Sequence, residues 1–408
     1  MARFATSLVL TVLLVVTGAV PARAQLTLVE AVRLALLNNP TLAAKERETA
    51  GVRAGEITAG LRPNPTASYA AEQLGASGVE PQHTVALSQT LETGGKRRRR
   101  IESARGATRV SELELADVQR LLVAQVKKAF TDLLVAGGTV RLATENLQTL
   151  DEVERVNRVR AEKGDIAEVE LLRIQVQRFA FERDLVDARQ AVQAARAALR
   201  AAVGARGLAD DFVVEGDLAF RDVPLDRERV LQASIERRAD VRAADAGRGK
   251  ARADLELARA NAWWDVAPQV QYQRIGSDNT FGLGVSIPIR VFDRNQGEIA
   301  RAGAEITRAD QLRQAAIDQA RSEIETALAL VASEREKVLR LGGEYVLRAQ
   351  RIRETVQFAY RRGALSVLDL LDAERTYRET TLEHLRALGN YWNAVYQLEA
   401  AAGGSLEP

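Results

Sequence analysis

The chain has 408 residues, of which 46% are hydrophobic and 27% charged, so it is long enough for two or three domains with folded cores. Aromatic residues make up only 5%, a share that is typical of long helices and coiled coils. The net charge of +2 gives no electrostatic case for a nucleic-acid partner or an acidic substrate. The absence of cysteine excludes disulfides, thiol ligands and a cysteine-linked lipid anchor.

Residues 1–24 have the pattern of a secretory signal peptide. Arg3 supplies a positive start, an apolar run follows, and Ala22-Arg23-Ala24 forms a small-x-small cleavage site, so we expect the mature chain to begin at Gln25. An N-terminal membrane anchor is the competing interpretation, but the apolar run is shorter than the ~20 residues that a spanning helix needs. No later stretch reaches ~18 apolar residues, so a membrane role has to come from strands.

The first half of the mature chain, residues 25–204, alternates helical and strand patterns. A helical pattern from Thr27 is interrupted at Asn38-Asn39-Pro40 and ends before Arg62-Pro63-Asn64-Pro65. Alternating runs at about 66–73 and 84–91 predict two strands. A long helix follows, turns at Gly164, and returns from about Ile166 to Val203. Its apolar seam in steps of three and four predicts coiled-coil packing: Leu115, Val118, Leu122, Val126, Ala129, Leu133, Ala136, Val140, Ala143, Leu147, Leu150.

The second half, residues 226–403, repeats this plan after a connector at 205–225, and a short tail covers 404–408. A helix around 230–262 precedes strands at about 266–275 and 280–289. The second strand is expected to run without a loop into a helix of roughly 65 residues that turns at Gly363. Pairs of matching residues in the two halves, such as Gly204 and Gly403, are separated by about the same distance along the sequence, which predicts an internal duplication.

The element lengths point to a membrane-spanning assembly. A helix of ~65 residues is on the order of 100 Å long, and tilted strands of ~8 to 10 residues are about long enough to cross an outer membrane. Four strands cannot close a transmembrane barrel, so several chains have to share one. Tyr69, Tyr272, Trp263 and Trp264 are candidates for aromatic girdles at the membrane interfaces. For the two tryptophans, packing where helix meets strand is an equally good interpretation.

Three segments carry a resemblance to a known family: Leu87–Arg97, Ile287–Ile289 with Arg294–Gly297, and Gly363–Ala373. In their order and spacing the chain resembles the TolC family of outer-membrane efflux channels, and within it the CzcC-type members of heavy-metal efflux systems. The similarity covers essentially the whole mature chain.

The resemblance implies a mainly α-helical protein with membrane β-structure. Three identical chains would form a twelve-stranded barrel in the outer membrane of a Gram-negative bacterium and a twelve-helix tunnel across the periplasm. It also implies contact with outer-membrane lipid, and docking onto a periplasmic adaptor and an inner-membrane RND-type pump. The function expected is passive conduction of pumped substrates, with heavy-metal cations as the cargo. The alternatives are a duct for drugs and other organic compounds in the same family and, from a different class, a soluble periplasmic coiled-coil adaptor or scaffold.

Asp369 and Asp372 are candidates for a periplasmic gate. They lie three residues apart, which puts both carboxylates on one helical face, and they match the paired aspartates that ring the narrow entrance in TolC. A threefold ring of such carboxylates favours cations. The alternative is that acidic residues near a helix N-terminus simply complement the helix dipole.

The resemblance adds Glu170 and Tyr360 to this gate. The latch arginine of TolC is not preserved, because Leu365 takes its place, and Arg361 or Arg362 is the candidate substitute.

Two further groups of residues match family features. The turn glycines allow positive φ, and with their neighbours they resemble the tips that meet the adaptor, as well as plain helix-hairpin turns: Gly164, Asp165, Ile166, Gly363, Leu365, Ser366. The junction between strands and long helices comprises Gly94, Gly95, Lys96, Arg97, Pro288, Arg294, Asn295, Gln296, Gly297.

The basic run Lys96–Arg100 lies at this first junction. In an exported protein it fits phospholipid headgroups or a wet lumen better than nucleic acid. Positive charge at a helix start is unfavourable for the dipole, which points to a role beyond stability.

No residue pattern supports an enzyme, a metal centre or a bound cofactor. Only His83 and His384 are available as imidazole ligands or bases, one in a predicted loop and one in a predicted helix, with no paired ligand beside either. A metal cargo would therefore pass through the protein without being held at a His or Cys site.

Overall fold

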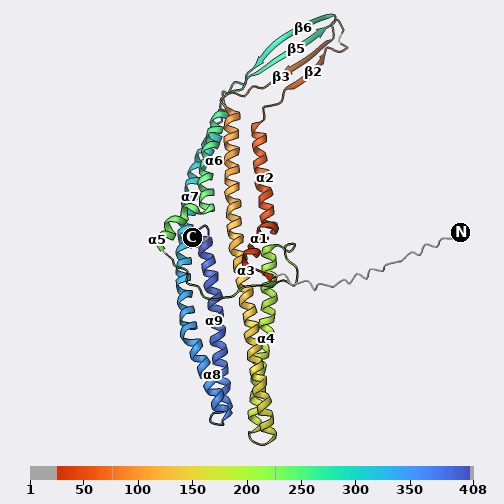
Figure 1. The fold of residues 1–408 in the computed structure, drawn as a ribbon. Helices are drawn as coiled ribbons and strands as arrows, with labels where there is room; N and C mark the ends of the chain where they lie inside the picture. Colours follow the sequence, from red (N-terminus) through yellow and green to blue (C-terminus); the bar gives the residue numbers. More distant parts are fainter. Residues whose placement is uncertain (1–24, 76, 226, 405–408) are drawn as a thin grey trace, which may run out of the picture.

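The computed structural model describes residues 25–75, 77–225 and 227–404, so the signal peptide expected over 1–24 and nearly all of the 404–408 tail lie outside the described residues. The described chain is a long rod of helices with a small sheet at one end (Figure 1). Two helical hairpins form the end of the rod opposite the sheet, and shorter helices flank its middle. No helix in the described ranges is both long enough and apolar enough to cross a membrane.

Two short helices open the first half. Helices α1 (Leu28–Asn38) and α2 (Pro40–Gly60) meet at Asn39, which has extended backbone and whose Oδ1 accepts a hydrogen bond from Leu42 N at 3.0 Å. Pro40 occupies the first position of α2, where a missing N–H costs nothing because that group has no intrahelical partner. The predicted interruption at Asn38-Asn39-Pro40 is therefore confirmed.

Helix α3 (Lys96–Glu162) has 67 residues and turns at Gly164 into α4 (Glu168–Val203), which begins two residues later than expected. The predicted apolar seam of α3 is confirmed, because Leu122, Val126, Leu133 and Leu150 are buried and the other members are buried or packed against the core. Packing along this seam joins α3 to α4.

The second half repeats the hairpin but differs from the prediction in two places. The single helix expected at 230–262 is two helices, α5 (Arg227–Arg237) and α6 (Ala239–Asn261), because Arg238 has extended backbone as Asn39 does. The second long helix is α7 (Gln296–Arg340) and α8 (Val346–Arg361), joined without a break by a π-helical turn, Leu341–Tyr345. Hydrophobic periodicity does not reveal a π-turn, since it adds only one residue to a helical turn. Helix α9 (Val367–Ala401) returns.

The sheet has the order β2-β3-β5-β6 and is antiparallel throughout. Its strands are β2 (Thr66–Glu72), β3 (Gln82–Ser88), β5 (Ala267–Ile275) and β6 (Asp278–Ser286). His83, expected in a loop, therefore lies on β3.

The expectation that the last strand runs directly into its helix is wrong. Strand β6 ends at Ser286, and Ile287 and Ile289 lie in a non-helical segment that reaches Asn295. Two features account for this: β6 has no neighbour on its outer side within the described ranges, and Pro288 has no N–H to extend a ladder. Strand β3 also ends early, but there Leu91 still pairs with Val266 across the sheet.

A short parallel pair of strands lies at the middle of the rod, and neither strand was predicted from the sequence. Strand β1 (Gln25–Leu26) pairs with β4 (Val213–Val214), which lies in the connector. Leu26 and Phe212 join the core that α1, α3 and α4 form. The connector is therefore held against the first hairpin.

The two hairpins touch along α3 and α9, where small residues allow close approach. A Cβ added at Gly389 would lie 2.4 Å from Val135 Cγ2, and one at Gly138 would lie 2.9 Å from Leu385 Cδ2. Lys127 Nζ and Glu399 Oε2 form an ion pair at 2.5 Å across the same contact. The described chain is thus one packed unit with a shared helix interface.

Candidate functional site at the hairpin tips and the junction

At the tips, a buried tyrosine joins the two hairpins. The hydroxyl of Tyr360 on α8 donates a hydrogen bond to Asn157 Oδ1 on α3, and Asn157 Nδ2 donates to Val153 O at 2.7 Å. Both Tyr360 and Asn157 are buried, and burial raises the pKa of Tyr360 above its ordinary value. The phenol therefore stays neutral and remains a donor at physiological pH.

Apolar side chains from α3, α4, α8 and α9 surround this bond. They form one buried cluster: Leu150, Ile174, Phe181, Tyr360, Val367, Leu370, Leu371. Water is kept from the Tyr360–Asn157 bond, which strengthens it relative to a surface bond. Hydrophobic packing and the Tyr360–Asn157 hydrogen bond thus hold the tips of the two hairpins against each other.

The charged surroundings of Tyr360 include one predicted and one unpredicted residue. The guanidinium of Arg160 lies 5.7 Å from the ring centroid of Tyr360, within cation–π range. Glu170, a predicted gate residue, is close enough for its charge to act on the Tyr360 pKa in the raising direction. Glu170 therefore acts on Tyr360 through its charge, and Arg160 is the charged side chain that contacts the ring.

Arg361 and Arg362, the candidate substitutes for the latch arginine, contact residues of their own helix. Arg362 lies over the ring of Phe358 on its own helix, 4.4 Å from the centroid, and Arg361 Nε donates to Gln357 O at 3.3 Å. Arg160 is the arginine that contacts Tyr360. Nothing in the periodicity of α3 distinguishes Arg160 from its neighbours, so the sequence carried no signal for it.

Asp369 and Asp372 make different local contacts. Asp369 Oδ2 accepts hydrogen bonds from Ser366 N at 2.9 Å and Ser366 Oγ at 2.7 Å, which form a capping box and lower the pKa of the Asp369 carboxyl. Asp372 is 67% exposed and pairs with Arg375 at 2.9 Å. Asp369 therefore has the helix-start role that was the alternative to a gate, and Asp372 is available at the surface.

The tip turns themselves require glycine. Gly164 and Gly363 have φ of 79° and 75°, in the left-handed region that other residues rarely adopt. In the first turn Asp165 N bonds to Arg160 O at 2.8 Å, and in the second Ala364 N bonds to Ala359 O at 3.0 Å. The two tips have the same backbone design, with Asp165 and part of Leu365 facing solvent.

At the first junction the backbone turns through Gly94 and Gly95, both with positive φ. A side chain at Gly94 would meet the Trp263 ring at 2.9 Å, so Trp263 packs where helix meets strand. Lys96 is buried and its Nζ lies 2.7 Å from Asp265 Oδ1, which also accepts from Thr93 N at 3.0 Å. The junction is thereby fixed to the start of β5.

The basic run has a structural partner that the sequence did not reveal, the C-terminus of α2. Arg97 Nε donates to Gly60 O at 2.6 Å, and Arg100 donates to Ala59 O at 2.9 Å and Leu61 O at 2.8 Å. Arg100 also pairs with Glu92. Positive charge that is unfavourable for the dipole of α3 is favourable at the C-terminus of α2, where carbonyls lack helical partners.

At the second junction Asn295 likewise donates a hydrogen bond to the C-terminal end of a helix. Asn295 has φ of 64°, and its Nδ2 donates to Ala258 O at 2.7 Å in the last turn of α6. Gln296 Oε1 accepts from Arg294 N at 2.8 Å. Pro288 lies in the segment after β6, and a Cβ at Gly297 would meet nothing within 4 Å, so Gly297 has no steric requirement.

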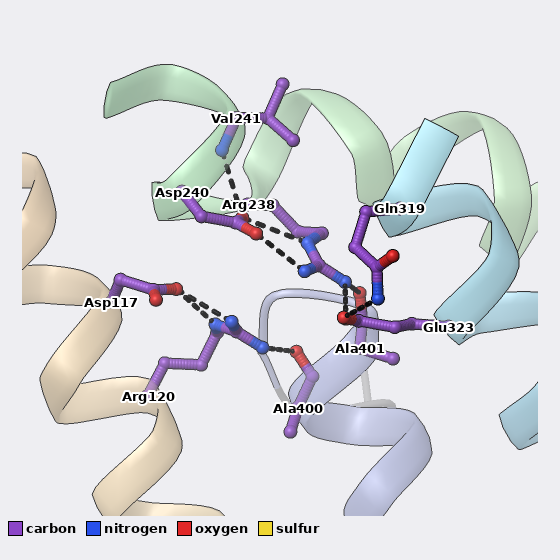
Figure 2. A network of polar contacts seen from close by, with 9 residues as sticks. All are labelled: Asp117, Arg120, Arg238, Asp240, Val241, Gln319, Glu323, Ala400 and Ala401. Atoms are coloured by element: carbon purple, nitrogen blue, oxygen red, sulfur yellow. Dashed lines mark hydrogen bonds and ion pairs between the residues drawn. The ribbon is translucent and has the colours of Figure 1, made fainter. Parts of the chain in front are cut away.

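A buried polar network in the middle of the rod was missed by sequence reasoning (Figure 2). Arg238 is only 2% exposed, and it forms two hydrogen bonds to Asp240, an ion pair with Glu323 at 2.7 Å and a bond to Ala401 O at 3.2 Å. Arg120 on α3 donates to Asp117 and to Ala400 O beside it. The network ties α6, α7 and α9 together and meets α3. The sequence carries one clue to this network: Arg238 occupies the position in the second half that Asn39 occupies in the first.

The two histidines lie in different parts of the structure and have different neighbours. His83 lies beside Tyr69 on the sheet, whereas His384 is half-buried on α9 against Gly342 of the π-turn, and burial lowers the pKa of His384. Within the described ranges no group of three or more His, Cys, Asp or Glu side chains could hold a metal ion.

Comparison with known proteins gives a consistent result. Residues 31–205 and 230–404 each match the outer membrane efflux protein family. The chain is 27% identical over 389 residues to the cobalt-zinc-cadmium resistance protein CzcC of Cupriavidus metallidurans, covering 93% of this chain and 90% of that protein. It is also 27% identical over 303 residues to the nickel-cobalt-cadmium resistance protein NccC of Alcaligenes xylosoxydans xylosoxydans, covering 72% and 66%.

Solved channel structures share the fold. A crystal structure of CusC, from work on transmembrane channel formation, matches with a TM-score of 0.77 and 19% identity, over 93% of this chain and 92% of that chain. The open-state structure of the Neisseria gonorrhoeae MtrE outer membrane channel matches with a TM-score of 0.77 and 21% identity, over 93% and 89%. The chain therefore belongs to the outer membrane efflux protein family, in the CzcC-like group of TolC-type channels, and is an outer-membrane protein that extends into the periplasm.

Proposed function

We propose that this protein is the channel component of a tripartite efflux system, a passive exit duct for heavy-metal cations. The observation that carries the proposal is the two-faced sheet at the end of the helical rod. Large apolar side chains are exposed on one face: Tyr69, Val85, Leu87, Val270, Phe281, Leu283, Val285. The other face is mostly small or uncharged and polar, with Ser68, Thr84 and three glutamines of β5. This alternation is that of a strand between lipid and water.

The sheet is incomplete by itself, which supports a homotrimer. Among the described residues, strands β2 and β6 each have a free edge, and an open edge in lipid leaves backbone groups unsatisfied. Three copies would supply twelve strands, enough for a closed barrel, and six hairpins for a helical tunnel. The apolar face would then face lipid and the glutamines would face the lumen.

The tips of the hairpins are the proposed periplasmic entrance. Tyr360 and Asn157 would hold the hairpins of one chain together there, and Glu170 would act on Tyr360 through its charge. Asp369 and Asp372 from three chains would line the opening and favour cations. The exposed turns at Gly164 and Gly363 would meet the adaptor that links the channel to an RND-type pump.

The cargo assignment rests on the relatives, which are named for resistance to cobalt, zinc, cadmium and nickel. Growth of a deletion strain on a panel of metal salts and organic toxicants tests it. Sensitivity confined to metals is the expected result, and sensitivity confined to organic compounds would assign a different cargo to the same duct.

Fractionation and conductance test the channel itself. The mature protein should be recovered from detergent-extracted outer membranes as a trimer, and should conduct ions in a planar bilayer. Replacing both Asp369 and Asp372 with Asn should weaken cation selectivity and block by multivalent cations. Recovery as a soluble monomer, or a selectivity unchanged by the double substitution, would contradict the channel or the gate respectively.

A further inference from the structure

We propose that the far end of the sheet carries a binding site for a phosphate-bearing lipid headgroup, built from His83 and Arg274. The site lies at the end of the sheet away from the helices, because β3 begins and β5 ends there (Figure 1). Since the helices extend into the periplasm, that end faces the outer leaflet. The proposal rests on the sheet being the membrane-spanning part of the proposed channel.

The strand register arranges the exposed face in rows. One row is Ala67, Leu87, Val270, Leu283. The next row toward the far end is Tyr69, Val85, Tyr272, Phe281. The row beyond it is Ala71, His83, Arg274, Asn279. An aliphatic row, an aromatic row and a polar row thus follow in order, which is the sequence of environments from hydrocarbon through the interface to headgroups.

The aromatic hydroxyls reach toward the polar row. Tyr69 OH lies 2.9 Å from His83 Nδ1, with the two rings stacked at a centroid distance of 6.2 Å, and Tyr272 OH donates to Asn279 Oδ1. These bonds orient the apolar parts of both tyrosines toward the aliphatic rows and their polar ends away from them. They also place the boundary between the apolar band and the headgroup layer at this position.

His83 and Arg274 are direct cross-strand partners, so their side chains stand side by side on this face. When Tyr69 donates to Nδ1, the imidazole hydrogen is on Nε2, which has no partner among the described residues. Arg274 Nε donates to Gly276 O at 3.1 Å, and this leaves the two terminal nitrogens unpaired in the described chain. Two donor side chains that stand beside each other suit the several oxygens of one phosphate.

No carboxylate in the described ranges forms an ion pair with Arg274 or His83. Glu72 and Asp278 lie in the next register row, on the opposite face of the sheet. Glu80 approaches Gly276 in the adjacent loop, but it forms no ion pair with Arg274 in the described chain. An anionic headgroup at the membrane boundary is the ligand that complements both the charge and the neighbouring aromatic row.

Native mass spectrometry of the detergent-solubilised mature protein tests the site, with lipid A, which carries two phosphates, as the probe and dephosphorylated lipid A as its matched control. Arg274→Gln should weaken lipid A binding about fivefold, the effect of removing one cation from a membrane surface, and the Arg274→Gln, His83→Gln pair should weaken it further. Arg351→Gln, which removes an exposed charge from α8, should leave binding unchanged. Binding of the dephosphorylated lipid should not respond to any of these substitutions.

Equal lipid A affinity of the wild type and the double variant would overturn the site, as would an equal loss in Arg351→Gln. Displacement of lipid A by millimolar inorganic phosphate would reassign the pair to free anions and also overturn it. If Arg274→Gln misfolds, Arg274→Lys keeps the charge but loses the fork, and should give a smaller loss than removal of the charge. Failure of the wild type to fractionate with outer membranes would instead refute the proposed channel.

Discussion

Asn39 and Arg238 stand at equivalent places in the two halves of the chain, and each donates a hydrogen bond to the end of the helix that returns from its hairpin. Asn39 Nδ2 donates to Ala202 O at 2.8 Å, and Arg238 Nη1 donates to Ala401 O at 3.2 Å. Each bond spans 163 residues. Because both donors sit where extended backbone separates two short helices, their side chains point across the rod, and both halves are pinned at its middle.

Arg238→Met should lower the free energy of unfolding by about 2 to 3 kcal/mol, because it leaves Asp240 and Glu323 without their counter-charge. The loss is moderated because solvent reaches these partly exposed carboxylates. Asn39→Ala should cost about 1 to 2 kcal/mol, from one cap and one buried hydrogen bond. Thermal inactivation of conductance measures both. Arg348→Ala, which breaks a surface pair with Glu344, is the control and should cost less than 1 kcal/mol. A loss of stability in the control as large as that in Arg238→Met would contradict the role of Arg238 in holding the middle of the rod together.

Tyr360→Phe should raise the basal conductance of the channel in a planar bilayer, since it removes the hydrogen bond that joins α8 to α3 at the tip and leaves Asn157 Oδ1 buried without this donor. Asn157→Ala should have a similar effect, and the double variant should add little, because both substitutions break one bond. Tyr345→Phe, on the exposed π-turn, is the matched control. Additive effects of the two tip substitutions would show that the residues act separately.

The Tyr360 contact should also weaken in alkali. Its pKa is raised in the folded state, so its contribution is fully present below the pKa of an unfolded tyrosine, about 10, and is lost as the pH rises through the folded value. Hydrogen exchange of the α8 amides should therefore accelerate above about pH 10 more steeply in the wild type than in Tyr360→Phe. Identical pH profiles would rule out this titration as the cause.

Arg100→Ala and Arg98→Ala separate two roles of the basic run. Arg100 donates to Ala59 and Leu61 carbonyls and pairs with Glu92, so its loss should cost about 1 to 2 kcal/mol and speed hydrogen exchange at the end of α2. Arg98 is 71% exposed, and its ion pair in the described part of the chain is a long one, to Glu102, so its loss should change stability by less than about 0.5 kcal/mol. Equal effects of the two substitutions would argue against helix capping as the role of Arg100.

Much of the architecture could be read from periodicity. The seam from Leu122 to Leu150 on α3 and the glycines at the tips predicted long hairpins, because burial repeats every three to four residues and positive φ selects glycine. The end of β6 could not be read in this way. Ile287 and Ile289 continue the alternating pattern, yet the strand stops at Ser286, since pairing depends on a neighbouring strand as well as on the pattern.

The candidate site, too, could be predicted from the sequence only in part. The sequence by itself determined the order of helices and strands, the duplication and the positions of the turns, because these depend on local dihedral preference and on which face of each element is apolar. Only the tertiary structure decided that Tyr360 bonds to Asn157, 203 residues away, that Arg97 and Arg100 cap α2, and that Arg238 is buried among carboxylates. A periodic pattern specifies which face of a helix is covered. The partner of a polar side chain depends on which distant segment packs there, and that is settled when the hairpins meet.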